Sequence, residues 1–322
     1  MDIFGTILWP IKWVVELILV AWHWVLTNVG LDPAAGLTWV LSIVGLTVVV
    51  RAALIPIFVR QIKNQRRMLE VAPQLKKIQE KYKGKKDQFS REAMSRETME
   101  LYKKTGTNPL SSCLPLLLQM PIFFSLFQVL NGAQSGKAGV GPLNETLAQQ
   151  FGNASLFGIA PLHQSFQGAL NANPQQTAVM IIAATMVVLM TGSQFLTQLQ
   201  IVSKNMSPET KASPQFKQQR ILLYLLPFVF LFSGFAFPLG VMFYWLTSNI
   251  WTMAQQFLVI RNMPTPGSDA AKAREARLAR KGKLINEEGA VVLTVNESDV
   301  PKKTTQRVQP VSKTRAKKQT GK

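Results

Sequence analysis

The chain has very little cysteine and histidine, and its four apolar runs at residues 39–58, 110–130, 177–202 and 221–260 have no acidic residue. Its 322 residues include one cysteine, Cys113, and two histidines, so no disulfide can form within the chain. No set of Cys and His residues has the spacing of metal ligands, and no Walker loop or nucleophile–base pair occurs. We therefore expect no enzymatic chemistry, no cofactor and no metal.

The most prominent feature of the sequence is its set of long apolar runs. A bilayer core about 30 Å thick requires about 20 mainly apolar residues for each spanning helix. Four runs are long enough and nearly free of charge: residues 39–58, 110–130, 177–202 and 221–260. The last run is long enough for two helices that turn near Pro238. We predict an all-α polytopic membrane protein with five transmembrane helices, at about residues 37–59, 109–130, 177–202, 220–236 and 239–260.

Positive charge alternates between the connections of these helices. The formal net charge of +19 comes almost entirely from residues 60–104 and 261–322, which carry +8 and +9, and the short connection 203–220 adds +3. Residues 131–176 are neutral overall. Basic segments between spans stay on the cytoplasmic side. We therefore predict a multi-pass protein of the bacterial cell membrane, with its N-terminus outside and its C-terminus in the cytoplasm.

Residues 1–36 allow two interpretations. The stretch 3–26 is apolar enough for a sixth span, but Lys12, Glu16 and His23 fall on one narrow helix face and several tryptophans are present. A polar stripe with interfacial tryptophans is typical of a helix that lies in the plane of the membrane surface. We favour such an extracytoplasmic surface helix, and the sixth span remains the alternative.

The two most basic segments outside the membrane differ in pattern. Residues 60–107 have apolar side chains at helical spacing (Val71, Leu75, Ile78 and Tyr82) before Gly84, which predicts a cytoplasmic helical hairpin. Residues 263–322 are basic with few aromatics, which predicts a mostly disordered tail. Both segments are candidates for binding anionic lipids or ribosomal RNA. The simpler alternative is that their charge only fixes the topology.

Arg51 is the residue on which the functional interpretation rests, because it lies within the first predicted span. An intramembrane arginine requires water or a partner. The other predicted spans contain no Asp or Glu, so no carboxylate from them can pair with it. We expect Arg51 to face a hydrated cavity, while snorkelling to the membrane surface is the alternative.

Other polar residues of the predicted spans recur at the i, i+4 spacing that places two side chains on one helix face. Three helices with such faces could together line a hydrophilic groove. The candidate groove residues are Thr47 and Arg51, Gln194 and Gln198, Tyr244 and Ser248, and Trp245 and Asn249.

Several motifs in the same order resemble the YidC family of bacterial membrane protein insertases and its mitochondrial and chloroplast relatives. They are the Arg51 span, residues 108–110 with 113–115, residues 119–123, and Tyr244–Trp245 with Ser248–Asn249 and residues 255–256. The resemblance covers the core, about residues 37–262. The segment before the first predicted span is too short for the large extracytoplasmic domain of Gram-negative members, so the chain is most similar to the actinobacterial type.

The resemblance implies that the matching arginine lies in a groove open to the cytoplasm and to lipid, with Thr47, Gln198 and Trp245 among its lining residues. It further implies an insertase and chaperone for nascent membrane proteins that works alone or with the Sec translocon and needs no nucleotide. Two other functions remain open: a scaffold that assists the translocon without inserting anything, and a pore or transporter for small solutes.

Overall fold

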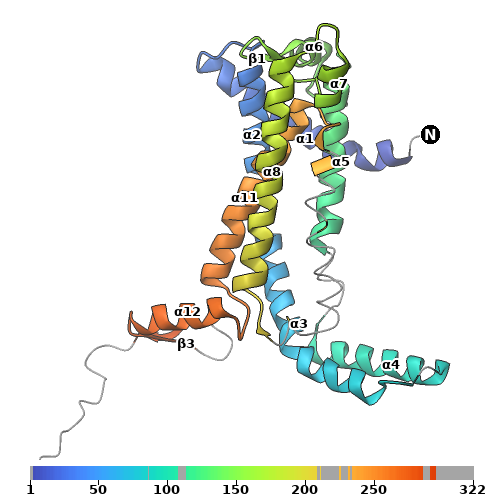
Figure 1. The fold of residues 1–322 in the computed structure, drawn as a ribbon, viewed down its shortest axis with the longest axis vertical. Helices are drawn as coiled ribbons and strands as arrows, with labels where there is room; N and C mark the ends of the chain where they lie inside the picture. Colours follow the sequence, from blue (N-terminus) through green and yellow to red (C-terminus); the bar gives the residue numbers. More distant parts are fainter. Residues whose placement is uncertain are drawn as a thin grey trace, which may run out of the picture. The chain divides into compact units, whose positions relative to one another are not determined.

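The structure is a computed structural model that describes residues 3–85, 87–107, 114–208, 211, 225, 231–232, 234–285 and 291–294. It is mostly helical (Figure 1), as the sequence predicts. The long helices are α1 (Ile3–Asn28), α2 (Gly36–Ala53), α3 (Ile55–Lys81), α4 (Gln88–Thr105), α5 (Leu114–Gln134), α8 (Thr177–Lys204) and α11 (Leu239–Asn262). The short elements are α6 (Glu145–Asn153), β1 (Ser155–Leu156), β2 (Ala160–Pro161), α7 (Phe166–Asn171), α12 (Asp269–Ala279), β3 (Lys283–Ile285) and β4 (Val291–Thr294).

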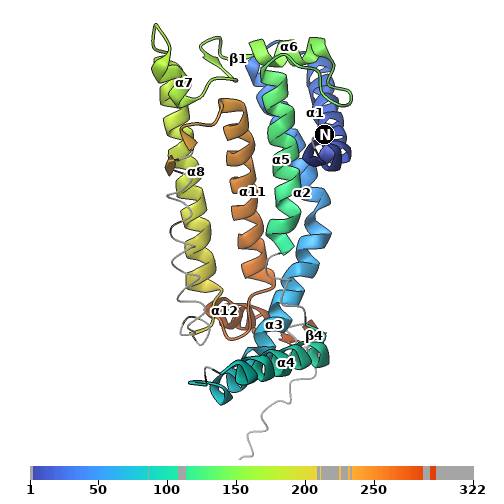
Figure 2. The same cartoon turned by 90° about the vertical axis from the view of Figure 1, so that its right-hand side faces the viewer.

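The chain forms two compact units, Met1–Lys272 and Ala273–Lys322. The first unit holds all the long helices, and its centre is a bundle in which α11 packs against α2 and α8 while α1 packs against α2 and α5 (Figure 2). In the second unit, β3 and β4 pair in antiparallel fashion.

The core of the bundle is apolar and draws on each of these helices. Trp39 and Leu46 of α2, Leu130 of α5 and Met242 of α11 are completely buried. The opposite faces of the helices are also apolar, as at Val188 of α8 and Phe257 of α11, which are 65 % and 53 % exposed. Helices that are apolar all round are typical of a bundle surrounded by lipid.

Among the residues that the structure describes, three helices are long and apolar enough to cross a membrane: Gly5–Asn28, Gly36–Ala53 and Thr177–Lys204. The predicted number of five spans stays a prediction, as does the placing of the N-terminal helix on the membrane surface. The predicted span 220–236 and the family motif 108–113 lie largely outside the described residues, as does the tail from residue 295.

The first predicted span, residues 37–59, crosses a helix junction. Helix α2 ends at Ala53 and α3 begins at Ile55, with Leu54 between them still in right-handed helical geometry. Pro56 lies in the first turn of α3, where its missing N–H is tolerated. Because the backbone stays helical through Leu54, α3 continues α2 with little change of direction (Figure 2).

A compact cap, residues 135–176, covers one end of the bundle. It contains α6, β1, β2 and α7, and it rests on the first turns of α2 and α11 (Figure 2). Trp39 of α2 packs edge-on against Phe151 of α6, with ring centroids 5.1 Å apart. The first amides of α11 donate to the cap, from Leu239 to the Gln164 carbonyl at 2.9 Å and from Gly240 to the Leu162 carbonyl at 3.0 Å.

Helix α1 turns its polar residues toward the protein. Glu16 and His23 are 1 % and 4 % exposed, whereas Ile7 and Trp24 on other faces are both 66 % exposed. His23 stacks on Trp39 and contacts the carbonyl of Pro33 at 2.9 Å. The polar stripe that the sequence places on one face is therefore an internal contact surface.

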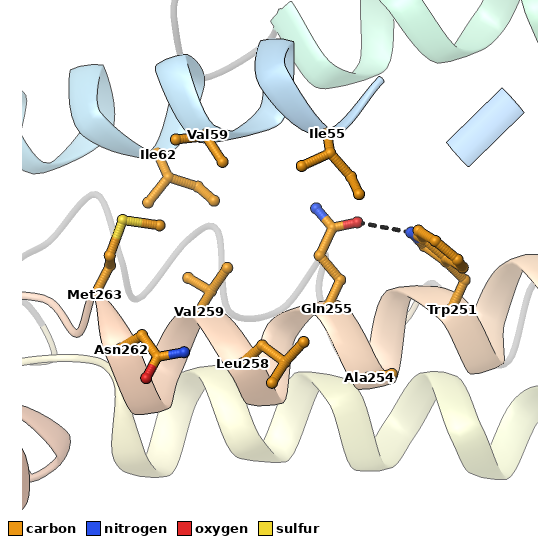
Figure 3. A pocket seen from close by; sticks show the side chains of 10 residues that line it. All are labelled: Ile55, Val59, Ile62, Trp251, Ala254, Gln255, Leu258, Val259, Asn262 and Met263. Atoms are coloured by element: carbon orange, nitrogen blue, oxygen red, sulfur yellow. Dashed lines mark hydrogen bonds between the residues drawn. The ribbon is translucent and has the colours of Figure 1, made fainter. Parts of the chain in front are cut away.

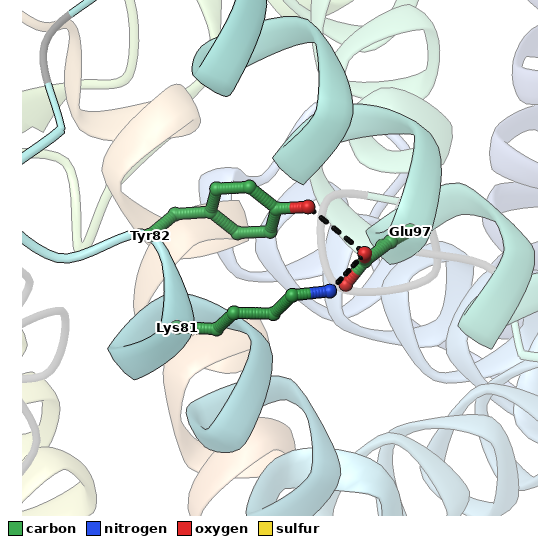
Figure 4. Close-up of polar contacts among 3 residues, drawn as sticks. All are labelled: Lys81, Tyr82 and Glu97. Carbon is green, nitrogen blue, oxygen red and sulfur yellow. Dashed lines mark hydrogen bonds and ion pairs between the residues drawn. The ribbon is translucent and has the colours of Figure 1, made fainter.

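Helices α3 and α4 are joined through residues 82–87 and linked by a polar contact (Figure 4). Lys81 pairs with Glu97 at 2.5 Å, and the Tyr82 hydroxyl donates to the same carboxylate at 2.8 Å. The hydrogen bond to Glu97 raises the pKa of Lys81, and the hydrogen bonds from Lys81 and Tyr82 lower the pKa of Glu97. Lys81 and Tyr82 lie at the end of α3, whereas Glu97 lies near the middle of α4.

Candidate functional site

Arg51 lies in the last turn of α2 and is partly buried. Its Nη2 donates a hydrogen bond to the hydroxyl oxygen of Ser248 in α11. The ion pairs among the described residues join Lys76 to Glu80 and Lys81 to Glu97, and neither involves Arg51. Within the described residues, Arg51 thus has a neutral partner and no carboxylate within ion-pair distance.

Two further side chains extend this contact to α5. Tyr244 lies one turn before Ser248 on α11, is 5 % exposed and interacts with the Ser248 side chain. The Gln119 side-chain amide of α5 donates to the Tyr244 hydroxyl at 3.2 Å. We call Arg51, Ser248, Tyr244 and Gln119 the Arg51 site. Its polar contacts link α11 to α2 through Ser248 and to α5 through Tyr244.

Asn249 was predicted to share a groove with Arg51, but its contact lies on another side of α11. Its side-chain amide donates to the carbonyl of Met190 in α8 at 3.3 Å. Ser193 donates to the same carbonyl at 2.9 Å. Because neighbouring residues on a helix point about 100° apart, Ser248 faces α2 while Asn249 faces α8. Asn249 therefore links the two helices that make the most extensive contact in the bundle.

Thr47 and Trp245, two other predicted groove residues, lie in packed surroundings. Thr47 is 1 % exposed and its hydroxyl donates to the Ile43 carbonyl one turn earlier at 2.7 Å. The Trp245 ring contacts Phe123 and Phe237, with centroids 5.7 and 5.5 Å apart. Both flank the Arg51 site, Thr47 on α2 and Trp245 on α11.

Gln194 and Gln198 of α8 are partly exposed. No hydrogen bond between described side chains connects either glutamine to Arg51. The structure thus brings Arg51, Tyr244 and Ser248 together, places Thr47 and Trp245 next to them, and leaves Asn249 and the two glutamines on the α8 side. Gln119 is the member of the site that spacing rules did not select, although it belongs to the family motif at residues 119–123.

An apolar pocket of about 340 Å³ adjoins the Arg51 site on the side away from the cap. It lies between α3 and the second half of α11 (Figure 3). Ile55 lies one turn beyond Arg51 and Trp251 lies three residues beyond Ser248, so pocket and site follow one another along the same helices. The lining residues are Ile55, Val59, Ile62, Trp251, Ala254, Gln255, Leu258, Val259, Asn262 and Met263.

The walls of the pocket are almost entirely apolar. Its main polar side chain, Gln255, accepts a hydrogen bond from the Trp251 indole N–H at 3.0 Å (Figure 3). The indole N–H of Trp251 therefore has its hydrogen-bond acceptor within the protein. The pocket is therefore suited to apolar groups rather than to a charged or strongly polar ligand.

Sequence comparison identifies the relatives of the chain. A model of the 60Kd inner membrane protein family matches residues 30–266. Membrane protein insertase YidC of Tropheryma whipplei (strain Twist) is 45 % identical over 321 residues, which cover 98 % of each chain. The protein of the same name from Streptomyces avermitilis is 45 % identical over 87 % of this chain and 63 % of its own. That from Bifidobacterium longum is 35 % identical over 97 % and 95 %. The chain belongs to the 60Kd inner membrane protein family, the family of the YidC-type membrane protein insertases.

Proposed function

We propose that the protein is a membrane protein insertase of the bacterial cell membrane, which moves nascent membrane proteins into the bilayer. The relatives named above carry that name. The observation that carries the proposal is Arg51, a cation among apolar helices with a serine hydroxyl and no carboxylate as its partner in the described part of the chain. Such a charge is costly in the membrane and is retained where it has a use.

In this proposal Arg51 attracts the polar N-terminal tail of a client protein. Attraction between opposite charges is stronger in the low-dielectric surroundings of a membrane than in bulk water. An acidic residue of the tail supplies the carboxylate that the described helices do not offer. The hydrogen bond to Ser248 holds the guanidinium in place for this encounter, and the bond from Gln119 to Tyr244 supports the same part of α11. No enzymatic step and no cofactor is required.

The apolar segment of the client follows a different path. We propose that it first meets the apolar pocket between α3 and α11 and then moves along the lipid-facing sides of α8 and α11. Leu196 of α8 and Ile250 and Phe257 of α11 are all more than half exposed. Moving an apolar segment along such faces into lipid replaces contact with water by contact with hydrocarbon, which is favourable in itself.

The proposed topology has five spans, at about residues 37–59, 109–130, 177–202, 220–236 and 239–260. Residues 1–36 and the cap lie outside, the helices α3 and α4 form a cytoplasmic hairpin, and the basic tail 263–322 is cytoplasmic. The charge of the connections supports this orientation. Thr47, Gln194, Gln198, Trp245 and Asn249 are proposed to border the groove around the Arg51 site.

The basic cytoplasmic segments suggest further partners. We propose that the hairpin and the tail bind anionic lipid headgroups and the ribosome, and that the insertase works with the Sec translocon on some clients. Binding to phosphate groups of either kind weakens steeply as salt concentration rises.

Reconstitution separates an insertase from a scaffold that only assists the translocon. Purified protein in liposomes without translocon is supplied with a single-span client, and the protected fraction is measured after protease treatment. We expect protection well above that of empty liposomes. Equal protection in both preparations would contradict the insertase.

A further inference from the structure

Glu16 of α1 has a buried carboxylate that the proposed insertion route does not use. The side chain is 1 % exposed. Its Oε1 accepts a hydrogen bond from the Val140 backbone N–H at 2.9 Å, and its Oε2 accepts one from Gly141 at 2.7 Å. Successive backbone N–H groups that point at one anion form a strong anion-binding concavity. In this protein the anion is a side chain from 124 residues earlier in the chain.

The loop that supplies these amides has no side chain where α1 approaches. A Cβ atom on Gly139 would lie 2.2 Å from a carboxylate oxygen of Glu16. A Cβ atom on Gly141 would lie 2.6 Å from the Trp13 ring. Both contacts are shorter than real Cβ atoms make, so glycine at these positions permits α1 and the cap to come together.

Helix α1 also fills the space between two helices of the Arg51 site. Val15 and Leu19 are buried in the core with residues of α2 and α5. Trp22 lies so close to α2 that a Cβ atom on Gly45 would approach its ring to 2.5 Å. Within the described residues, α2 and α5 make few contacts with each other, so α1 joins them.

In addition to its packing against α2, the cap is hydrogen-bonded to the bundle on two sides. On one side the first amides of α11 bind the carbonyls of Leu162 and Gln164. On the other side Glu16 binds the amides of Val140 and Gly141. We infer that Glu16 is a positioning residue, whose contact holds the cap over the bundle and closes the Arg51 site toward the outside. This inference rests on the proposed function, in which the cap side is extracytoplasmic.

The closure is tested with a reporter on the cap side of Arg51. Thr47 lies one turn nearer the cap on α2, and Thr47→Cys in a Cys113→Ser background provides a single thiol. Intact cells are treated from outside with a membrane-impermeant maleimide, and the labelling rate is compared with and without Glu16→Gln. We expect at least about tenfold faster labelling with Glu16→Gln, corresponding to the loss of one hydrogen bond to a charged group. An unchanged labelling rate overturns the inference.

Glu145→Gln is the matched control, because Glu145 is an exposed acid in the same cap. It should leave the reporter as protected as in the parent protein. Faster labelling with Glu145→Gln than in the parent would contradict a specific role of Glu16.

A second pair of variants separates a lost contact from general misfolding. Gly139→Ala places a methyl group against the Glu16 carboxylate and should expose the reporter as Glu16→Ala does. Combined with Glu16→Ala, it should add little, because residues in direct contact have non-additive effects. Additive effects would overturn the inference. Insertion of acidic and neutral clients in the same strains tests the proposed function separately, since a preference that depends on Arg51 can persist when the reporter result fails.

Discussion

Arg51 of α2 and Ser248 of α11 are joined by a hydrogen bond between residues 197 positions apart in the chain. A serine hydroxyl orients a guanidinium but leaves its charge in place. Arginine has five N–H donors, so a single contact to Ser248 leaves donors for another acceptor. In the proposed function, this pair gives the insertase a fixed cation that can still receive a client carboxylate.

Removing the Tyr244 hydroxyl should weaken this arrangement. Tyr244→Phe deprives Gln119 of its acceptor and Ser248 of a polar neighbour. We expect a small loss of stability, about 0.6 kcal/mol for an average interhelical hydrogen bond in a membrane. We also expect slower insertion of clients with acidic tails, with little effect on neutral ones, because Arg51 is held less firmly.

Asn249→Ala is the control for that experiment, because it removes a hydrogen bond from the same helix to α8 rather than to the Arg51 site. Thermal unfolding should show a similar loss of stability for both variants. Insertion assays should show no dependence of the Asn249→Ala effect on tail charge. If Tyr244→Phe also slowed both client classes equally, its role would be only structural.

Filling the apolar pocket should slow insertion whatever the charge of the tail. Leu258 lines the pocket and is 55 % exposed, so Leu258→Trp adds volume where the apolar client segment is proposed to enter. Leu17→Trp on α1, at a leucine 43 % exposed that lies outside both the pocket and the proposed route, is the matched control. Insertion rates that fall equally in both variants, or in neither, would count against the pocket as an entry site.

The link between α3 and α4 should depend on pH at both ends of the scale. The pKa of Glu97 is lowered from 4.5 and that of Lys81 is raised from 10.5 by their mutual hydrogen bond. The stabilisation is therefore fully present between these two values. It is lost as pH falls through the lowered pKa of Glu97 or rises through the raised pKa of Lys81.

Hydrogen exchange of amides in α3 and α4 measures this link. Glu97→Gln should speed exchange near Lys81 at neutral pH, and Glu100→Gln on the same helix should not. Protection that is identical in the parent protein and Glu97→Gln would show that the link contributes nothing.

The sequence predicts some of these features well because they depend on composition and on spacing within one helix. Arg51 stands out because the predicted spans contain no acid, and Tyr244 and Ser248 share a helix face. Gln119 and Asn249 could not be assigned this way, because their partners depend on which neighbouring helix each side of α5 and α11 meets. Spacing within a helix does not specify that neighbour.

Glu16 is a second case in which the sequence does not reveal the partner of a polar side chain. Its place in a polar stripe suggested contact with the aqueous side of the membrane surface. The structure buries the carboxylate instead, because backbone amides of a loop far along the chain satisfy it. The segment 139–141 has no polar side chain, so the sequence gives no sign that its N–H groups will bind an anion.

Replacing Arg51 should also distinguish charge from geometry. Arg51→Lys keeps the charge but not the planar, forked arrangement of donors. If charge and hydration suffice, this variant should retain most of the insertion of acidic clients in liposomes. A loss as large as that of Arg51→Ala would instead indicate a bidentate contact to the client.

The most direct measurement is a double-mutant cycle between Arg51 and the client tail. Insertion rates into liposomes are determined for the parent protein and Arg51→Ala, each with a client whose tail carries an acidic residue and with one in which that residue is neutral. We predict a strong coupling: Arg51→Ala slows the acidic client by about tenfold, as expected for about 1.4 kcal/mol of interaction, and changes the neutral client little. Equal slowing of both clients would contradict a direct encounter between Arg51 and the client carboxylate.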